Sequence, residues 1–220
     1  MRVLPARLRG IAARAVVVAT LVTGAGVAVA AAPAAAAPCT DINVVSARGT
    51  SEPGTLGIIV GDSVYSALRS RITGRSLSAY AVNYPADVSV GSASRGNADL
   101  VDHVTRQAAS CPNQRFILVG YSQGANVVDN SIGISSQGAA VGGPIVARIP
   151  ASVEPRVAAI LLFGNPIRAI GKRVTGTYAS RALDLCALGD PVCGNGIDVL
   201  AHLTYGRNAN QAATFAAGKV

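Results

Sequence analysis

Short apolar segments alternate with longer mixed segments through most of the chain. Five segments are strand candidates, and four of them are continuous or nearly continuous apolar runs, as expected for strands that are covered on both faces. The mixed segments 55–72 and 94–110 carry apolar residues at helical spacing, and further helices are expected directly after residue 122 and over about 208–218. The five expected strands are residues 42–47, 77–84, 115–120, 157–164 and 182–188.

This alternation predicts the fold class. Strands that alternate with helices along the chain form a parallel sheet with helices on both faces, so we expect a three-layer α/β/α fold with about five mostly parallel strands. Residues 131–156 interrupt the pattern because they are rich in Gly, Ser and Pro and carry little charge. They fit either a long surface loop with a frayed helix or a mobile apolar flap near a site, and the sequence leaves both open.

The first 37 residues differ from the remainder. Four arginines precede a long apolar stretch that begins at Ala15, and Ala35-Ala36-Ala37 offers small residues for cleavage. This order predicts a secretory signal peptide in residues 1–37. An uncleaved membrane anchor is the alternative, although alanine and glycine make a weak membrane span. The composition, 50% hydrophobic and 14% charged, suits one globular domain over residues 38–220, secreted or associated with the cell wall.

Removal of the signal changes the charge of the protein. The formal net charge is +8, but four of the 19 basic residues and none of the 11 acidic ones precede residue 38, which leaves +4. A charge of this size does not indicate nucleic-acid binding. It permits weak association with anionic lipid or the cell envelope, and we expect a monomer.

The four cysteines all follow the predicted signal. An even number of cysteines in an exported protein predicts two disulfides, for which three pairings exist. The short spacing of Cys186 and Cys193 favours a local loop, which leaves Cys39 to pair with Cys111. We expect no metal site, because the chain has no C-x-x-C motif and neither histidine stands at ligand spacing.

One serine follows an apolar strand pattern and precedes a helix pattern. Residues 120–124, GYSQG, match the G-x-S-x-G motif, in which the serine stands on a strained strand-to-helix turn that exposes its hydroxyl. In a glycine-rich chain the motif alone is weak, but its position between a strand and a helix is the required context. Ser122 is therefore the predicted nucleophile.

A serine nucleophile needs a base and an acid. In folds of this order both follow the serine, so His202 fits the base and His103 does not; we expect His103 to be a solvated surface residue on its helix. Asp184, Asp190 and Asp198 are the candidates for the acid. Asp190 is favoured, because its loop lies between two cysteines and is stiffened by Pro191, and a rigid loop suits a carboxylate that must orient an imidazole.

The developing oxyanion needs hydrogen-bond donors. The backbone N–H of Gln123, directly after the predicted nucleophile, is one expected donor. A second is expected from a loop after an early strand, where Thr50 in ARGTSEPG offers an N–H and a hydroxyl. From the residues alone this segment reads as a turn.

Several motifs together resemble a known family. ARGTSEPGTLG, YAVNYPA, CPNQRFILVGYSQGA, CALGDPVC and a late AHLTYG occur in the order found in cutinases, and most resemble the secreted cutinase-like esterases of mycobacteria. The resemblance covers the chain from Cys39 to its end. Fungal cutinases usually carry serine where Thr50 stands, and segment 131–156 is longer than in those enzymes.

The resemblance implies a small α/β-hydrolase that cleaves carboxylic esters of lipids or polyesters through an acyl-enzyme. It implies Ser122, His202 and Asp190 as the triad and Thr50 with Gln123 as the oxyanion hole. It also implies two disulfides, Cys39–Cys111 and Cys186–Cys193, and no cofactor. The alternatives are a carbohydrate acetyl esterase and a non-catalytic envelope-binding or antigenic protein on the same scaffold.

Overall fold

The computed structural model describes residues 39–220, so the predicted signal peptide lies outside the described residues. A single five-stranded sheet forms the centre of this region, and all neighbouring strands are parallel. The strand order is β2-β1-β3-β4-β5, and the five parallel strands agree with the α/β prediction. The strands are β1 (Ile42–Ala47), β2 (Leu77–Ala81), β3 (Arg115–Tyr121), β4 (Val157–Phe163) and β5 (Ala182–Leu185).

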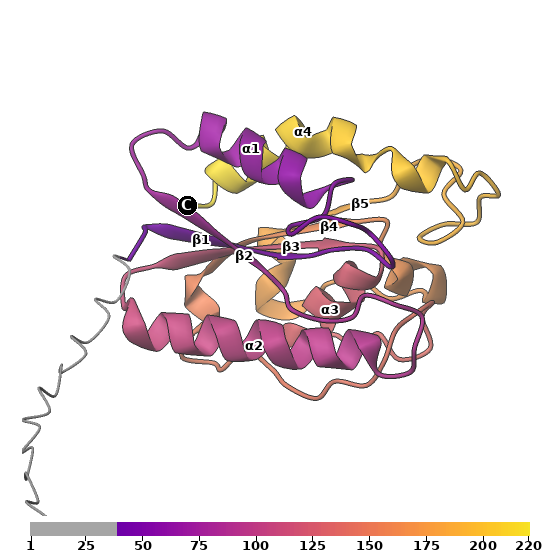
Figure 1. Ribbon diagram of the computed structural model, residues 1–220, viewed down its shortest axis with the longest axis horizontal. Helices are drawn as coiled ribbons and strands as arrows, with labels where there is room; N and C mark the ends of the chain where they lie inside the picture. The colour runs from indigo at the N-terminus through magenta and orange to yellow at the C-terminus, as the bar shows by residue number, and fades with distance from the viewer. Residues whose placement is uncertain (1–38) are drawn as a thin grey trace, which may run out of the picture. The chain divides into compact units, whose positions relative to one another are not determined.

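Helices cover both faces of the sheet, which confirms the predicted three-layer fold (Figure 1). Helices α1 (Gly61–Arg71) and α4 (Ala209–Ala217) pack together on one face. Helices α2 (Ser92–Ser110) and α3 (Gln123–Ser131) pack on the other. Within residues 39–220, none of the helices combines the length and apolar character needed to cross a bilayer.

The alternation of side chains along the strands divides the core into two clusters. In β3, Ile117 and Val119 face α1 and α4, whereas Phe116 and Leu118 face α2 and α3. The strands at the centre of the sheet are thus buried on both faces, which explains their continuous apolar sequences.

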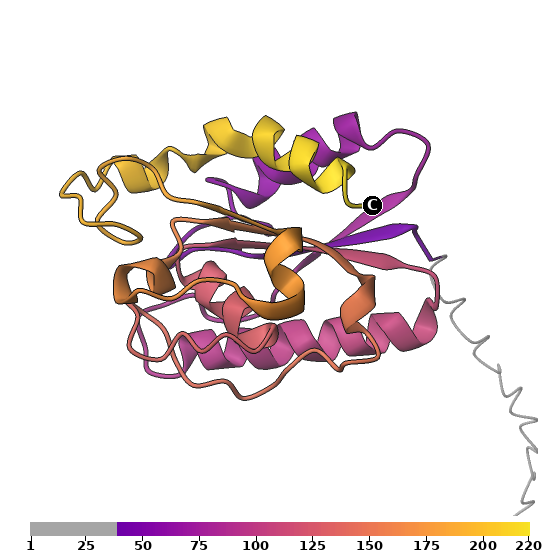
Figure 2. The ribbon, with the colours of Figure 1, turned by 180° about the vertical axis from the view of Figure 1, so that it is seen from behind.

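Most element boundaries lie close to those expected from the sequence, but three elements are shorter, among them β2, which ends at Ala81 and not at residue 84. The helix expected over 55–72 begins only at Gly61, because the chain forms turns in which Gly54 and Gly57 adopt positive φ angles. The strand expected over 182–188 ends at Leu185, where the loop of the second disulfide begins. Five short 3-10 helices, several of them visible in Figure 2, complete the domain: Glu154–Arg156, Pro166–Ile170, Gly176–Arg181, Ala201–Leu203 and Tyr205–Asn208.

Segment 131–156 is a long loop that three asparagines fasten to α2 and α3. Asn97 accepts hydrogen bonds from two backbone N–H groups of this loop and donates to the Ala147 carbonyl at 2.9 Å. Asn126 and Asn130 donate to further backbone carbonyls of the loop. Of the two alternatives for this segment, the structure shows the loop, but without the frayed helix: beyond α3 it contains turns up to the 3-10 helix at its end.

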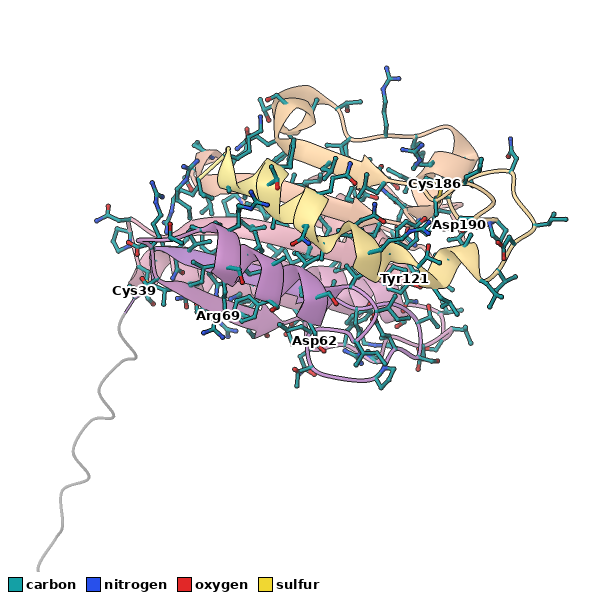
Figure 3. The ribbon with its side chains drawn as sticks, turned by 90° about the horizontal axis from the view of Figure 1, so that it is seen from above. Cys39, Asp62, Arg69, Tyr121, Cys186 and Asp190 are labelled. Atoms are coloured by element: carbon teal, nitrogen blue, oxygen red, sulfur yellow. A yellow bond between two sulfur atoms is a disulfide. The ribbon has the colours of Figure 1, made fainter. Side chains whose placement is uncertain are left out.

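Two disulfides close loops of very different length. Cys39–Cys111 joins the segment before β1 to the end of α2 and spans 72 residues, whereas Cys186–Cys193 closes a seven-residue separation after β5. Figure 3 shows Cys39 at one end of the sheet and Cys186 at the other. The first disulfide therefore restrains the unfolded chain more strongly.

We predict that removing the two disulfides separately costs different amounts of stability. Replacement of Cys39 and Cys111 by alanine should lower the free energy of unfolding by about 4 kcal/mol, and replacement of Cys186 and Cys193 by about 2 kcal/mol, because the longer loop gains more entropy in the unfolded state. Urea denaturation of both double variants measures the difference. A larger loss of stability on removing Cys186–Cys193 would show that loop length does not determine which disulfide stabilises the protein more.

Candidate active site

Ser122 lies at a sharp corner between β3 and α3. Its φ angle is 53°, a conformation that is strained for a residue other than glycine. The motif glycines allow the corner to close. A Cβ atom on Gly124 would lie 1.9 Å from the carbonyl oxygen of Ala47, and one on Gly120 would lie 2.6 Å from that of Gly124. The motif spacing therefore reflects the close packing of α3 against the ends of β1 and β3.

His202 lies within hydrogen-bond distance of both Ser122 and Asp190. Its Nε2 is 2.9 Å from the Ser122 hydroxyl oxygen, and its Nδ1 is 2.8 Å from Oδ2 of Asp190. The backbone beside the ring belongs to Gly164, where a Cβ atom would lie 2.7 Å from Cε1 of His202. With its proton on Nδ1, the imidazole donates to the carboxylate and accepts from the serine hydroxyl. Its Nε2 can therefore remove the hydroxyl proton of Ser122.

Asp190 is a buried carboxylate with three hydrogen-bond donors. Only 1% of the residue is exposed, and its Oδ1 accepts from the Val192 N–H at 2.7 Å. Its Oδ2 accepts from His202 and from the Tyr205 hydroxyl, the latter at 2.5 Å. Burial raises the pKa of Asp190, but the hydrogen bonds from Tyr205, His202 and Val192 outweigh it and hold the pKa below its ordinary value. The carboxylate therefore stays charged although it is buried.

Tyr205 is a residue of this site that the sequence reasoning missed. Its hydroxyl accepts from the Ala187 N–H at 2.9 Å while it donates to Asp190, so it joins the start of the disulfide loop to the carboxylate. Its ring lies edge-on to that of His202, and a second tyrosine, Tyr121, donates to the backbone carbonyl of His202 at 2.7 Å. The only sequence signal was an aromatic residue three places after His202, in a chain with 4% aromatic residues.

The other two acid candidates have different partners. Asp198 accepts a hydrogen bond from the Leu200 N–H at 2.9 Å, a local turn contact. Asp184 accepts from the Asn165 amide at 3.1 Å, and its Oδ1 lies 3.7 Å from Nη1 of Arg168. Of the three candidates, Asp190 is the one that the structure brings to His202.

His103 is not the solvated residue that we expected. Its ring stacks on Tyr80 with centroids 3.5 Å apart, and its Nε2 lies 2.9 Å from Oδ1 of Asn43. Burial lowers the pKa of His103 to about 4, and the charge of Asp99 only partly opposes this effect. The prediction was wrong because helical spacing alone placed His103 on the polar face, whereas β2 supplies an aromatic partner there.

The two expected oxyanion donors lie at the ends of neighbouring strands. Gln123 is the first residue of α3, so its backbone N–H has no acceptor within the helix. Its side-chain amide donates to the Asp87 carbonyl at 2.8 Å, which fixes the residue. Thr50 lies in the turn after β1, and its buried hydroxyl has no hydrogen-bond partner among residues 39–220. Pairing of Ala47 with Gly120 brings the two strand ends together.

Glu52 shapes the turn that carries Thr50, and nothing in the sequence indicated this. Its buried carboxylate accepts from the N–H groups of Gly49 and Ile59, each at 2.6 Å. The Ser51 N–H donates to the Ala86 carbonyl at 2.6 Å, which joins the turn to the next loop. A sequence of turn-forming residues is thus held in one conformation by a side chain inside it.

Two further carboxylates, one buried and one half-buried, have raised pKa values. Asp129 of α3 is 0% exposed, and neither of its carboxylate oxygens has a hydrogen-bond partner within the described region. Burial and the charge of Asp184 raise the pKa of Asp129 well above its ordinary value. Burial also raises the pKa of Asp184 to about 6, against the opposing effects of Arg168 and Asn165. Asp129 therefore favours the protonated form in the folded protein, whereas Asp184 keeps its proton only below about pH 6.

Comparisons of the sequence and of the structure with known proteins find cutinases and other esterases. A family model described as cutinase matches residues 38–220. Carboxylesterase Culp1 of Mycobacterium tuberculosis is 40% identical over 195 residues, covering 83% of each chain. The solved structure of Trichoderma reesei cutinase in complex with a C11Y4 phosphonate inhibitor aligns with a TM-score of 0.67 and 33% identity, over 82% of this chain and 77% of that one. An acetyl xylan esterase aligns with a TM-score of 0.71 and 26% identity, over 83% and 99%.

We predict that replacing Asp184 by asparagine stabilises the protein more at neutral than at acidic pH. Because the folded-state pKa of Asp184 is raised to about 6, the wild-type protein loses stability as pH rises from about 4 through that value, and the variant does not. Urea denaturation between about pH 4 and pH 7 should show a growing stability difference in favour of the variant. The exposed Asp62→Asn serves as control, and a difference that stays constant with pH would contradict the prediction.

Proposed function

Because the chain belongs to the cutinase family and is a carboxylic ester hydrolase, we propose that it is a secreted serine esterase with Ser122 as nucleophile, His202 as base and Asp190 as acid. The observation that carries this proposal is the continuous hydrogen-bonded line from the Ser122 hydroxyl through His202 to Asp190, with distances of 2.9 and 2.8 Å. A family member without activity would not need to keep a charged carboxylate buried behind a histidine.

The reaction proceeds in two half-reactions. Ser122 Oγ attacks the ester carbonyl while His202 Nε2 takes the hydroxyl proton, and the charge of Asp190 stabilises the resulting imidazolium. The tetrahedral intermediate collapses, the alkoxide leaves with the proton from His202, and an acyl-enzyme remains. Water then attacks the acyl carbon with His202 again as base, which releases the acid and restores Ser122.

The oxyanion would be held by Gln123 and Thr50. Support comes from the Gln123 N–H at the start of α3, where the helix dipole also favours negative charge. The buried Thr50 hydroxyl, without a hydrogen-bond partner among the described residues, supplies a second donor of the required kind. Glu52 maintains the position of this turn and touches no substrate atom in the mechanism.

We propose a lipid or polyester substrate because apolar side chains stand exposed on the loops beside the site. Leu188 and Ile197 are 99% and 96% exposed on the loop that carries Asp190, and Val90 is 100% exposed on the loop whose Asp87 carbonyl binds Gln123. Exposed apolar side chains on the loops beside the site suit a water-insoluble ester better than a carbohydrate acetate. The two disulfides support export, because disulfides persist in oxidising compartments.

Replacing Ser122 by alanine should reduce kcat for p-nitrophenyl butyrate by at least about 10⁴-fold, because no other group would form the acyl-enzyme. The variant should keep its thermal transition and lose labelling by a fluorophosphonate probe. Ser66→Ala, on the outer surface of α1, is the matched control and should retain both activity and labelling. Substantial hydrolysis by Ser122→Ala would remove Ser122 from the proposed role.

Tyr205 is proposed as a positioning residue that acts through Asp190. In Tyr205→Phe the pKa of Asp190 should rise, because a hydrogen bond that lowers it is lost, and kcat/KM should fall about tenfold, the effect of one hydrogen bond to a charged group. The reduction in kcat/KM relative to the wild type should therefore grow as the pH is lowered, because Asp190 takes up a proton more readily in the variant. Tyr178→Phe, a buried tyrosine on the opposite face of the sheet, is the control. An unchanged pH profile would leave Tyr205 with a packing role alone.

A further inference from the structure

A basic hollow lies beside the disulfide loop, on the side formed by the segment after β4. The cavity has a volume of about 640 Å³. Figure 2 shows the 3-10 helix of this segment at the same end of the domain as the projecting loop before α4. The residues that line the hollow include three cationic side chains and no acidic one: Arg168, Ala169, Gly171, Lys172, Arg173, Cys193, Gly194 and Asn195.

The three cations of the basic hollow are poorly neutralised. Arg168 has one acidic neighbour, Asp184, at 3.7 Å, which is too long for a hydrogen bond. Lys172 donates to two backbone carbonyls of the long loop, at 2.9 and 3.4 Å, and these acceptors carry no net charge. Among the ion pairs of residues 39–220, none includes Lys172 or Arg173.

The contacts of Lys172 with the long loop give a structural reason for only one of the three cations in the basic hollow. Its contacts with the carbonyls of Ser135 and Gln137 fasten the long loop, which is a structural role. Arg173 is exposed, and no hydrogen bond or ion pair within the described chain holds it in place. Arg173 therefore adds, beside Arg168 and Lys172, a positive charge that local structure does not require. Arginine and lysine at one hollow are the residues that bind phosphate oxygens in proteins.

The opposite wall connects the basic hollow to the proposed catalytic loop. A second hollow of about 470 Å³ shares Arg168, Cys193, Gly194 and Asn195 with the first and continues to Asp190 and Leu188. Leu188 is almost fully exposed. A cationic surface and an apolar surface thus meet along one loop. Together they are complementary to a molecule with an anionic headgroup and an apolar tail.

We propose that the basic hollow binds a phosphate-type oxyanion, with Arg168, Lys172 and Arg173 as its ligands. The hollow would take the phosphate of a lipid headgroup while the apolar part of the same molecule contacts Leu188 and the adjoining loop. The proposal rests on the proposed function only in treating that lipid as a substrate, since phosphate binding itself needs no catalysis.

The test measures binding to vesicles with the Ser122→Ala protein, so that no lipid is hydrolysed and failure of binding is separate from failure of the esterase mechanism. Sedimentation with vesicles of phosphatidylglycerol and phosphatidylcholine is compared for this protein and for the same protein carrying Arg173→Glu. Arg69→Glu, an equal charge change on the exposed surface of α1 (Figure 3), is the matched control.

We expect Arg173→Glu to weaken binding at least about fivefold, the effect of one basic residue at an anionic surface, and Arg69→Glu to leave it near the parent value. Equal losses from both variants would overturn the proposal, because attraction would then follow net charge alone. Retained binding in Arg173→Glu would also overturn it. Arg173 makes no described polar contact, so this variant should fold, and a thermal transition verifies it; Arg173→Gln is the second variant if it does not.

A second arm separates lipid headgroup from free phosphate. Inorganic phosphate should displace the protein from the vesicles more effectively than chloride of equal ionic strength, and should raise the thermal transition of the Ser122→Ala protein but not of its Arg173→Glu form. Displacement by both salts to the same degree would show that the hollow does not recognise phosphate, and the proposal would fail. Binding of vesicles with no effect of inorganic phosphate on the thermal transition would overturn a site for the oxyanion itself.

Discussion

The start of α3 packs so closely against the end of β1 that Gly124 has no room for a side chain, and this contact fixes the corner on which Ser122 stands. The corner holds Ser122 at a positive φ angle, which a loosely packed turn would relax. The same contact brings the Gln123 N–H close to the turn that carries Thr50. Serine orientation and the proposed oxyanion donors are therefore consequences of one packing constraint between a helix and a strand.

A second constraint is the burial of Asp190. A carboxylate that is 1% exposed would lose its charge without compensation, and three donors compensate it. Asp129 shows the contrast inside the same domain, because it is buried without donors and its pKa is raised. Burial alone thus decides neither the charge nor the role of an acid. The hydrogen bonds from Tyr205, His202 and Val192 distinguish the two cases.

The sequence predicted the parts of this structure that depend on local pattern. Apolar runs located the central strands, because strands of a parallel sheet are buried on both faces. G-x-S-x-G located the corner, because the close approach of helix and strand leaves room only for glycine on either side of the serine. The pattern failed where a distant residue decides the outcome. His103 stacks on Tyr80 of a distant strand, which its position on the helix does not reveal. Glu52 accepts hydrogen bonds from Gly49 and Ile59 and so orders a turn that the sequence presents as an ordinary loop. Tyr205 was missed for the same reason, since its link to Asp190 exists only after both loops are folded.

The loop between β5 and α4 combines a buried carboxylate with exposed apolar side chains, and its construction keeps the two apart. Its base is buried and cross-linked, with Cys193 bonded to Cys186 and the Tyr205 hydroxyl joined to both Ala187 and Asp190. Its outer residues, Leu188 and Ile197, are almost fully exposed. Because the base does not depend on the exposed residues for its stability, these side chains are available for an apolar partner while the carboxylate keeps its distance to His202. A loop held only by hydrophobic contacts would have to bury the residues that this one leaves exposed.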